Sequence, residues 1–435
     1  MTERQHVLVV GAGFAGLYAA MGLRDAVREG HRVTVVNEES FFQYQPFLPE
    51  VASGTIDPRA AVVPLRRVLR HCRLVIGEVT RVDHDARRAH VRTTAGDEHE
   101  IVYDQIVLSP GSWSRVLPVP GLAERGIGFK TVQEAIYLRN HVLGQLDVAA
   151  SEEDAARRRA ALTFVFVGGG YAGVEALGEL EDLARDALRT YPEVDGSQMR
   201  WVLVDAADRI LPELPEALAS YAADQLRERG IEIFVGTRLT SAEDGVISLS
   251  NGEAFPGETL VWTAGVKPSP LARDSGFPVD DDGRLPVDPE LRVRGVEGAW
   301  AAGDAAAVPD ASTGGLNPPT AQHGLREGKR LAANLRAVIA GETPQPFVYA
   351  NIGGVCSLGR YQGVAVVKGL RFRGFVGWFL HRSYHLLAMP TWTRRVKIAM
   401  DWTVALLFPR DLAQLGSLGR PREPFERASG DQPPD

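Results

Sequence analysis

The chain has 435 residues, 45% of them hydrophobic and 24% charged, which predicts two or three globular domains rather than a disordered chain. A formal net charge of −7 argues against general nucleic-acid binding. The two cysteines, Cys72 and Cys356, lie far apart, which excludes a disulfide framework, and we expect both to be small buried side chains. We expect a protein of the cytoplasm or of a membrane surface, because neither a signal peptide nor a bilayer-spanning apolar run is evident. The oligomeric state stays open, with a homodimer as one option.

The start of the chain is typical of a strand, a glycine-rich turn, a helix and a second strand. HVLVV (6–10) is a short apolar run, LYAAMGLRDAVREG (17–30) has helical spacing, and RVTVV (32–36) is the second strand. GAGFAG (11–16) lies between the first strand and the helix. Its first glycine permits a tight turn, its second lets a pyrophosphate approach the backbone, and its third lets helix and strand pack closely. The helix N-terminus then offers unpaired N–H groups to the phosphates.

The same arrangement returns in the middle of the chain. FVFV (164–167) leads into GGGYAG (168–173), a long helix rich in Glu, Leu and Ala follows, and WVLVD (201–205) forms the next strand. Laid over the first copy, its glycines coincide with the earlier ones, whereas Glu175 takes the place of Tyr18. Two such units, each in a strand–turn–helix context, predict the binding of two dinucleotides.

The residue at the end of each second strand is expected to bind a ribose. Asp205 can accept hydrogen bonds from both ribose hydroxyls and repels a 2′-phosphate, which favours NADH over NADPH. Arg209 lies nearby and keeps NADPH open, and a solvated turn residue is the alternative interpretation of Asp205. In the first unit Asn37 stands where an acid is usual, so we assign that ribose contact to Glu38.

Two Pro/Gly-rich links, residues 108–121 and 261–270, separate the units, so the second unit is predicted to be inserted within the first. After the second link, GVEGAWAAGDAA (295–306) predicts a strand, a tight turn and an acid, Asp304, which either holds the polar linker of a flavin or caps a helix. The predicted divisions are 1–118 and 271–345 for the first domain, 119–270 for the inserted domain, 346–410 for a C-terminal region and 411–435 for a tail.

Residues 368–410 differ in character from the rest of the chain. They hold eight Lys or Arg against one acid, Asp401, and three of the seven tryptophans, Trp378, Trp392 and Trp402. Two helix-like apolar segments flank Pro390. They predict either amphipathic helices lying on an anionic lipid surface or ordinary core helices with a solvated basic face, and we favour the first. The Pro-rich end, 420–435, is expected to be disordered.

Taken together, these elements resemble the type II NADH:quinone oxidoreductases, a family of the two-dinucleotide-binding-domain flavoproteins. The resemblance extends from about residue 5 to about residue 410. In chain order it rests on GAGFAGL, QPFLPEVASG (45–54), GEV (77–79), SPGS (109–112), FKTVQEAIYLRNHVL (129–143), VGGGYAGVE, VDAADRILP (204–212), VWTAGVK, AAGDAA, PPTAQHGLREGK (318–329) and the basic aromatic tail. It implies an α/β fold with two Rossmann-like domains, for FAD and for NADH, followed by a membrane-associating helical region.

The resemblance also implies a function. FAD would be bound, NADH would be the cosubstrate and a membrane quinone the electron acceptor, without proton pumping. The protein would be peripheral, on the cytoplasmic face of the cell membrane, and would meet anionic lipid through residues 368–410. No metal is implied.

The glycine loops and the resemblance together assign two sets of cofactor-binding residues. For FAD these are Gly11, Ala12, Gly13, Phe14, Ala15, Gly16, Glu38, Pro46, Val79, Gly111, Gly303, Asp304, Ala321 and Gln322. For NADH they are Gly168, Gly169, Gly170, Tyr171, Ala172, Gly173, Glu175, Asp205, Ala264 and Gly265. By resemblance, Val79 meets the adenine, Pro46 and Gly111 lie near the isoalloxazine, Asp304 meets the ribityl chain, and Ala264 and Gly265 lie near the nicotinamide.

Glu175 and Gln322 are the candidates for catalysis. Glu175 either gains from the helix N-terminus or lies beside nicotinamide and flavin, and we favour the second. Gln322 matches the family's AQ motif, where quinone docks, but Arg326 stands where a second Gln is usual. His323 and Arg326 are candidates near the quinone or its proton path, or are structural.

The cysteines narrow the route by which electrons leave. Neither Cys72 nor Cys356 has a close partner, and no four-Cys or His/Cys metal spacing occurs. Electrons that reach the flavin are therefore expected to pass directly to an external acceptor. Two other functions remain as alternatives: a soluble NAD(P)H-dependent reductase that serves a small iron–sulfur protein, and a flavin-binding protein that senses NADH.

Overall fold

The computed structural model describes residues 4–349 and 352–414. Its first lobe is built on a seven-stranded sheet in the order β20-β8-β1-β2-β5-β6-β7. The strands β20, β8, β1, β2 and β5 are parallel, and β6 and β7 are antiparallel to their neighbours. The bounds are β1 His6–Val10, β2 Arg32–Asn37, β5 Arg73–Asp83, β6 Arg88–Thr93, β7 Glu98–Val102, β8 Gln105–Leu108 and β20 Ala299–Ala301. Because β20 follows the second glycine unit in the chain, the sheet is completed only after that unit, as the predicted insertion requires.

The helix expected over 17–30 is two helices, so this detail of the prediction is wrong. α1 (Phe14–Gly22) begins directly after the glycine turn, and α2 (Arg24–Arg28) follows a break at Leu23. α1 packs against α11 (Ala321–Ile339), and a Cβ on Gly22 would lie only 2.6 Å from the Cβ of Ala332. Close approach of the two helices therefore explains the glycine at which α1 ends.

The remaining elements of the first lobe are short. Two small sheets pair β3 with β4 and β19 with β21. The bounds are β3 Phe41–Gln43, β4 Val62–Pro64, α4 Leu65–Val68, α10 Leu271–Asp274, β19 Leu285–Pro286 and β21 Ala306–Ala307. α3 (Leu48–Ala52) follows β3 in the chain but packs against α6 (Val132–Ser151) and α8 (Tyr171–Ala187) of the second lobe.

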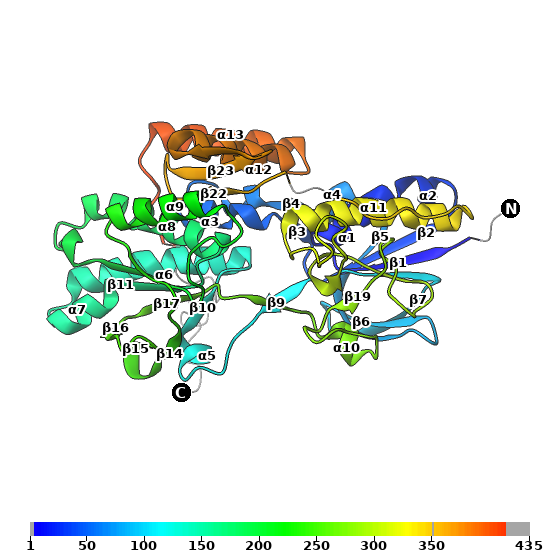
Figure 1. Ribbon diagram of the computed structural model, residues 1–435, viewed down its shortest axis with the longest axis horizontal. Coiled ribbons are helices and arrows are strands. Elements are labelled where there is room, and N and C mark those ends of the chain that lie inside the picture. Colours follow the sequence, from blue (N-terminus) through cyan, green and yellow to red (C-terminus); the bar gives the residue numbers. More distant parts are fainter. Residues whose placement is uncertain (1–3, 350–351, 415–435) are drawn as a thin grey trace, which may run out of the picture.

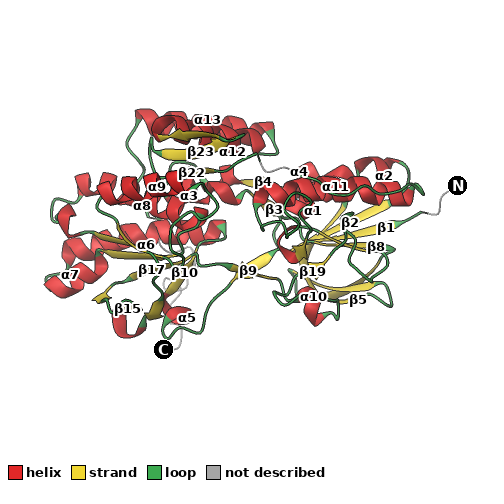
Figure 2. Cartoon of the chain, in the orientation of Figure 1, coloured by secondary structure: helices red, strands yellow, loops and turns green. Residues whose placement is uncertain are grey.

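The second lobe contains a five-stranded parallel sheet in the order β10-β17-β11-β12-β13. Every residue of β11 is buried, as expected for a parallel strand covered by helices (Figure 2). α8 begins at Tyr171, directly after the second glycine turn. The bounds are α5 Leu122–Arg125, β10 Gly126–Gly128, α6 Val132–Ser151, α7 Ala155–Ala161, β11 Thr163–Val167, α8 Tyr171–Ala187, β12 Arg200–Val204, α9 Glu216–Glu228, β13 Glu232–Phe234, β14 Leu239–Ser241, β15 Val246–Leu249, β16 Ala254–Pro256 and β17 Thr259–Trp262, with β14, β15 and β16 forming a separate antiparallel sheet.

The chain passes between the lobes through two paired strands. β9 (Ser112–Ser114) leads into the second lobe and β18 (Val266–Pro268) leads back, and the two pair antiparallel. Figure 1 shows β9 at the waist between the lobes. The predicted α/β fold with one Rossmann-like unit inserted in another is confirmed, while the residue limits of the domains stay predictions.

A third layer forms from the end of the described chain. It contains a three-stranded antiparallel sheet of β22 (Val355–Ser357), β23 (Gly363–Val367) and β24 (Leu370–Arg373), which the sequence interpretation did not anticipate. α12 (Gly374–Ala388) packs on β22 and β23 and contacts α13 (Trp392–Leu407), and both helices lie at the top of Figure 1. Among the described residues, no helix is both long enough and apolar enough to cross a membrane. The end predicted to be disordered, 420–435, lies outside the described residues.

Candidate functional site

The two glycine loops have matching geometry. A Cβ added to the third glycine, Gly16 or Gly173, would lie 1.9 Å from the carbonyl oxygen of the first glycine of its loop. A Cβ on the second glycine, Gly13 or Gly170, would meet nothing within 4 Å. The protein itself therefore requires the third glycine, whereas the second leaves open space at a helix N-terminus. This is the geometry that a pyrophosphate needs, so both loops fit a dinucleotide.

The strand-end residues hold equivalent positions in the two loops. The backbone N–H of Ala12 donates to Asn37 Oδ1 at 2.7 Å, and the N–H of Gly169 donates to Asp205 Oδ2. Asn37 thus supports its loop as Asp205 does, although it has no charge. The other oxygen of Asp205 accepts from the N–H of Ala207 at 2.6 Å. The sequence analysis assigned ribose binding to Asp205 but missed that it also braces the turn.

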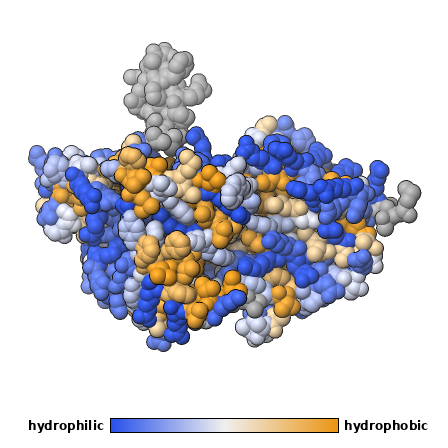
Figure 3. All heavy atoms as spheres, turned by 90° about the horizontal axis from the view of Figure 1, so that it is seen from above, coloured by the Kyte–Doolittle hydropathy of each residue, from blue (hydrophilic) through white to orange (hydrophobic). Residues whose placement is uncertain are grey.

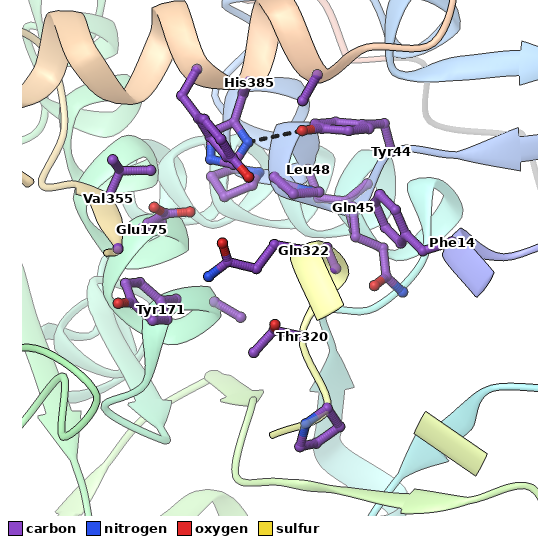
Figure 4. Close-up of a pocket in the computed structure, with 18 of the residues that line it drawn as sticks. Phe14, Tyr44, Gln45, Leu48, Tyr171, Glu175, Thr320, Gln322, Val355 and His385 are labelled. Atoms are coloured by element: carbon purple, nitrogen blue, oxygen red, sulfur yellow. Dashed lines mark hydrogen bonds between the residues drawn. The ribbon is translucent and has the colours of Figure 1, made fainter. Parts of the chain in front are cut away.

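A cavity of about 610 Å³ lies where the two lobes and the C-terminal layer meet. It is lined from the first lobe, from α8 of the second lobe, from α11 and from α12 (Figure 4). The predicted residues that line it are Phe14, Pro46, Tyr171, Ala172, Glu175, Gly265, Asp304, Ala321 and Gln322. Both candidates for catalysis, Glu175 and Gln322, are therefore brought to one space from residues 147 positions apart.

The other predicted residues do not line this cavity. They are Gly11, Ala12, Gly13, Ala15, Gly16, Glu38, Val79, Gly111 and Gly303 for FAD, and Gly168, Gly169, Gly170, Gly173, Asp205 and Ala264 for NADH. A dinucleotide is extended, so its pyrophosphate and adenosine would lie away from the space that receives its reactive ring.

Glu175 is buried and paired with a residue of the C-terminal layer. Its side chain accepts a hydrogen bond from the backbone N–H of Ser357 at 3.0 Å, and Oε1 lies 3.0 Å from His381 Nε2. Burial lowers the pKa of His381, but the Glu175 carboxylate more than offsets this, so the pKa stands above its usual value. Glu175 is the fifth residue of α8, beyond the first turn, and its partners are not the helix N-terminal amides. The helix-dipole interpretation of Glu175 is therefore disfavoured.

A second buried ion pair lies among the same elements. Arg382 Nε of α12 lies 3.4 Å from Glu50 Oε1 of α3, and Trp402 Nε1 donates to Glu50 Oε2. Burial raises the pKa of Glu50, and Arg382 opposes that shift. The guanidinium of Arg382 also stacks on the rings of Trp378 and Trp402, at 4.3 and 4.8 Å. These contacts fix α12 and α13 against α3, which itself packs on α8.

This packing corrects one part of the sequence argument for the C-terminal region. Arg382 and Trp378 are buried, and the Arg410 side chain is only 5% exposed, beside Asp186. These charges and this tryptophan hold the layer together and do not face solvent. The apolar side chains that are exposed are Phe375, Val376, Phe379 and Leu387 on α12, and Trp392, Val396, Met400, Val404, Leu406 and Leu407 on α13. Figure 3 looks down on this face and shows hydrophobic side chains gathered on it among hydrophilic ones.

Several residues of the site were missed by the sequence analysis. Tyr44 and His385 line the cavity, and Tyr44 Oη lies 3.0 Å from His385 Nδ1 (Figure 4). Burial, and then His381, lower the pKa of His385 well below its usual value, so the imidazole is neutral. The two histidines stand four residues apart on α12, with ring centroids 4.6 Å apart. Their i, i+4 spacing in the sequence could have indicated two histidines on one face of a helix, but the segment was interpreted as facing lipid.

Lys130 is a further missed residue. It lines the cavity, and its Nζ donates to Ser112 Oγ at 2.5 Å, which in turn donates to Asp304. Burial lowers the pKa of Lys130, while Asp304 and Glu134 oppose the shift. Asp304 is thus fixed by a polar chain on the cavity wall, which fits a role towards a flavin better than a helix cap. Lys130 belongs to the motif FKT, which the sequence analysis quoted without assigning it a role.

His323 and Arg326 do not line the large cavity. His323 is buried, its Nδ1 lies 2.7 Å from Thr320 Oγ1, and burial and then Arg326 lower its pKa. Arg326 Nη1 donates to the carbonyl oxygen of Gln322 at 2.8 Å. Each residue therefore contacts a residue of the cavity wall, Thr320 or Gln322, without lining the cavity itself.

The cysteines are free, and Cys356 is buried. Burial raises the pKa of Cys72 to about 12 and that of Cys356 well above its usual value. Thiol–disulfide chemistry needs a thiolate. The expected burial is confirmed for Cys356, whereas Cys72 is only partly buried.

Residues 5–328 match the Pyridine nucleotide-disulphide oxidoreductase family. The type II NADH:quinone oxidoreductase Ndh of Mycobacterium tuberculosis is 30% identical over an alignment of 423 residues, which covers 94% of this chain and 89% of that protein. The type II NADH:quinone oxidoreductase of Staphylococcus epidermidis is 31% identical over 87% of this chain and 94% of its own length. The fold matches the structure of NDH2 from Plasmodium falciparum in complex with NADH, with a TM-score of 0.88, 16% identity and coverage of 94% of this chain and 100% of that one. The chain belongs to the type II NADH:quinone oxidoreductase family.

Proposed function

We propose that this protein is an FAD-dependent enzyme that transfers electrons from NADH to a membrane quinone. The observation that carries the proposal is that Glu175 and Gln322 line one cavity. Glu175 lies on α8, the helix after the second glycine loop. Gln322 lies on α11, which packs on α1, the helix after the first glycine loop. FAD, when bound, accepts two electrons from NADH and passes them to the acceptor. The protein supplies binding, orientation and protons.

The residues present fit both cofactors. Gly13 and Gly170 leave space for the two pyrophosphates, and each precedes the first turn of a helix whose N–H groups face that space. Lys130, Ser112 and Asp304 form the polar wall that would hold the flavin side. Tyr171 and Gly265 would border the nicotinamide, since both line the cavity on the side of the second lobe.

Quinone reduction by NADH consumes one proton in addition to the hydride, because NADH + H⁺ + quinone gives NAD⁺ + quinol. Glu175 and His381 are placed to hold that proton, between Glu175 Oε1 and His381 Nε2. The apolar remainder of the cavity wall excludes water from the acceptor. Tyr44 and His385 present a second hydrogen-bonding pair on the same wall.

The acceptor is tested by comparing electron acceptors on the purified, FAD-loaded protein. We expect NADH oxidation to accelerate with a short-chain quinone and to be little changed by a small iron–sulfur protein. The opposite order of acceptors would favour the soluble-reductase alternative. A protein that binds both cofactors but oxidises NADH with neither acceptor would favour the sensor.

We further propose that the exposed face of α12 and α13 lies on the cytoplasmic surface of the cell membrane. Trp392 is 74% exposed and Leu407 72%, and Lys368, Arg371 and Arg373 are exposed nearby in the chain. This combination is typical of an interfacial helix on anionic lipid. Leu387 both lines the cavity and is exposed, so the cavity reaches the surface on this face, where a quinone dissolved in lipid could enter it.

Vesicle flotation tests the membrane contact. A cut before Lys368 is unsuitable, because it would remove His385 from the cavity wall and His381 from its contact with Glu175. Instead, serine at Trp392, Met400 and Leu407 should reduce binding to vesicles that contain anionic lipid, and serine at Val102, 58% exposed on β7, should not. Equal binding of the two variants would contradict the proposal.

A further inference from the structure

Tyr349, in the segment between α11 and β22, contacts three residues at the start of α11. Its hydroxyl donates to Gln322 Oε1 at 3.1 Å. Its ring meets the His323 ring almost at right angles, with centroids 5.2 Å apart. The guanidinium of Arg326 lies over the Tyr349 ring, 4.3 Å from its centroid. One tyrosine is thus held by two side chains and in turn holds the amide of Gln322.

The opposite end of the Gln322 amide is also engaged. Its Nε2 donates to the carbonyl oxygen of Gly353 at 3.4 Å. A backbone carbonyl only accepts hydrogen bonds, so the NH₂ group of Gln322 must lie on the side of Gly353. The oxygen of the amide then lies towards Tyr349, where a hydroxyl donor meets it. The Gly353 carbonyl therefore decides the orientation of the amide, and the Tyr349 hydroxyl, which can donate or accept, donates to the oxygen that this orientation presents.

This orientation has a consequence for the cavity that Gln322 lines. Nε2 carries two hydrogens, and the contact with Gly353 uses one. The second is left to donate into the cavity, where a quinone presents carbonyl oxygens that only accept. If the amide rotated by half a turn, its oxygen would face the quinone oxygen and repel it. The carbonyl of Gly353 opposes that rotation, because it can only accept, and the hydroxyl of Tyr349 holds the amide oxygen on the other side by donating to it.

Arg326 strengthens the arrangement. It stands four residues after Gln322, and its Nη1 donates to the carbonyl oxygen of Gln322. The same guanidinium covers the Tyr349 ring. The Arg326 guanidinium therefore fixes both the helix turn that carries Gln322 and the Tyr349 ring, whose hydroxyl holds the Gln322 side chain.

We propose that Tyr349, braced by Arg326 and His323, is a positioning residue for the acceptor step: it fixes the Gln322 amide so that its free N–H binds a quinone carbonyl. The inference rests on the proposed function. Tyr349 does not line the cavity, and it touches none of the residues assigned to NADH. Gln322 is assigned to FAD as well as to the acceptor, so we expect Tyr349 to act on that side of the cavity and not on NADH binding.

The test uses the FAD-loaded Tyr349→Phe variant, which keeps the ring but loses the hydroxyl. We expect the rate of flavin reduction by NADH to stay at the wild-type value and the apparent KM for a short-chain quinone to rise about three- to tenfold, as for the loss of one neutral hydrogen bond. Arg326→Met should raise the same KM, by a smaller factor. Tyr361→Phe, in the C-terminal layer and away from the cavity, is the matched control and should behave as wild type.

The outcomes separate the two claims. A wild-type quinone KM in Tyr349→Phe, or an equal loss in flavin reduction and quinone turnover, would overturn the positioning role. A wild-type enzyme whose flavin is reduced by NADH but not reoxidised by quinone would overturn the proposed function instead. Retention of FAD and an unchanged melting temperature in the variant would show that it folds.

Discussion

Replacing Glu175 by Gln removes the only carboxylate that ion-pairs with His381 within 4 Å among the described residues. Gln is nearly isosteric and keeps an oxygen that can accept from the N–H of Ser357. The other charges that act on His381 are Glu50, which raises its pKa, and Arg382, which lowers it. Without the Glu175 charge, burial becomes decisive and the pKa of His381 should fall below its usual value.

The magnitude follows from linkage between protonation and folding. Each unit of pKa difference between folded and unfolded chains corresponds to about 1.4 kcal/mol. In the wild type the pKa of His381 in the folded chain lies above the usual 6.5. The stability that His381 contributes is therefore fully present below pH 6.5 and is lost as the pH rises through the pKa of the folded state. In the variant the folded pKa lies below 6.5, so stability is lost as the pH falls below 6.5. The stability gap between the two proteins should therefore narrow with rising pH, by up to about 1.4 kcal/mol per unit.

Denaturant unfolding of both FAD-loaded proteins between pH 5.5 and pH 8.5 measures this gap. Glu124→Gln, an exposed change of the same charge on α5, serves as the control and should show no such slope. A gap between wild type and Glu175→Gln that is constant across the range would refute the assignment of His381 as the charged partner of Glu175.

Three further predictions concern the residues assigned to the cofactors and one residue that holds them. Gly170→Ala should melt at the wild-type temperature but raise the KM for NADH. Gly173→Ala should cost about 1–3 kcal/mol of stability, because its Cβ would meet the carbonyl of Gly168. Equal melting temperatures of the two variants would contradict the loop geometry. Asp205→Asn should keep the contact with the N–H of Gly169, as Asn37 keeps that with Ala12, but lose the contact with the N–H of Ala207, because an amide has one accepting oxygen. It should also reduce the preference for NADH over NADPH in kcat/KM about tenfold; an unchanged ratio would remove Asp205 from ribose recognition. Glu327 of α11 is buried and accepts a hydrogen bond from the backbone N–H of Gly303 at 2.8 Å. Burial raises the pKa of Glu327 to about 7, so its folded form keeps a proton that the unfolded chain releases from about pH 4.5. Wild-type stability should fall as the pH rises through this window and Glu327→Gln should not; parallel unfolding profiles would be the contrary result.

The dinucleotide units could be predicted because their signal is local. Glycine spacing, flanking apolar strands and a helix follow one another within about 35 residues, and each glycine has a steric reason that spacing alone conveys. The close packing of Gly22, at the end of α1, on Ala332 could not be predicted, since α11 lies about 300 residues later in the chain. Asn37 was seen as an exception, yet it bonds the loop as Asp205 does.

The acceptor side of the cavity was much less predictable. Tyr44 and His385 are 341 residues apart and meet only because α12 packs over the first lobe. Arg382 and Trp378 carry the composition of a lipid-facing helix but are buried, because Glu50 supplies an internal partner for the charge. Periodicity shows which side of a helix is apolar; it does not show which apolar surface is covered by another part of the chain.

The central claim is tested most directly by a single turnover of the purified, FAD-loaded protein without oxygen. One equivalent of NADH should bleach the yellow flavin, and a short-chain quinone added next should restore the colour at a rate that supports steady turnover. A flavin that is bleached by NADH but stays bleached in the presence of quinone would contradict the account.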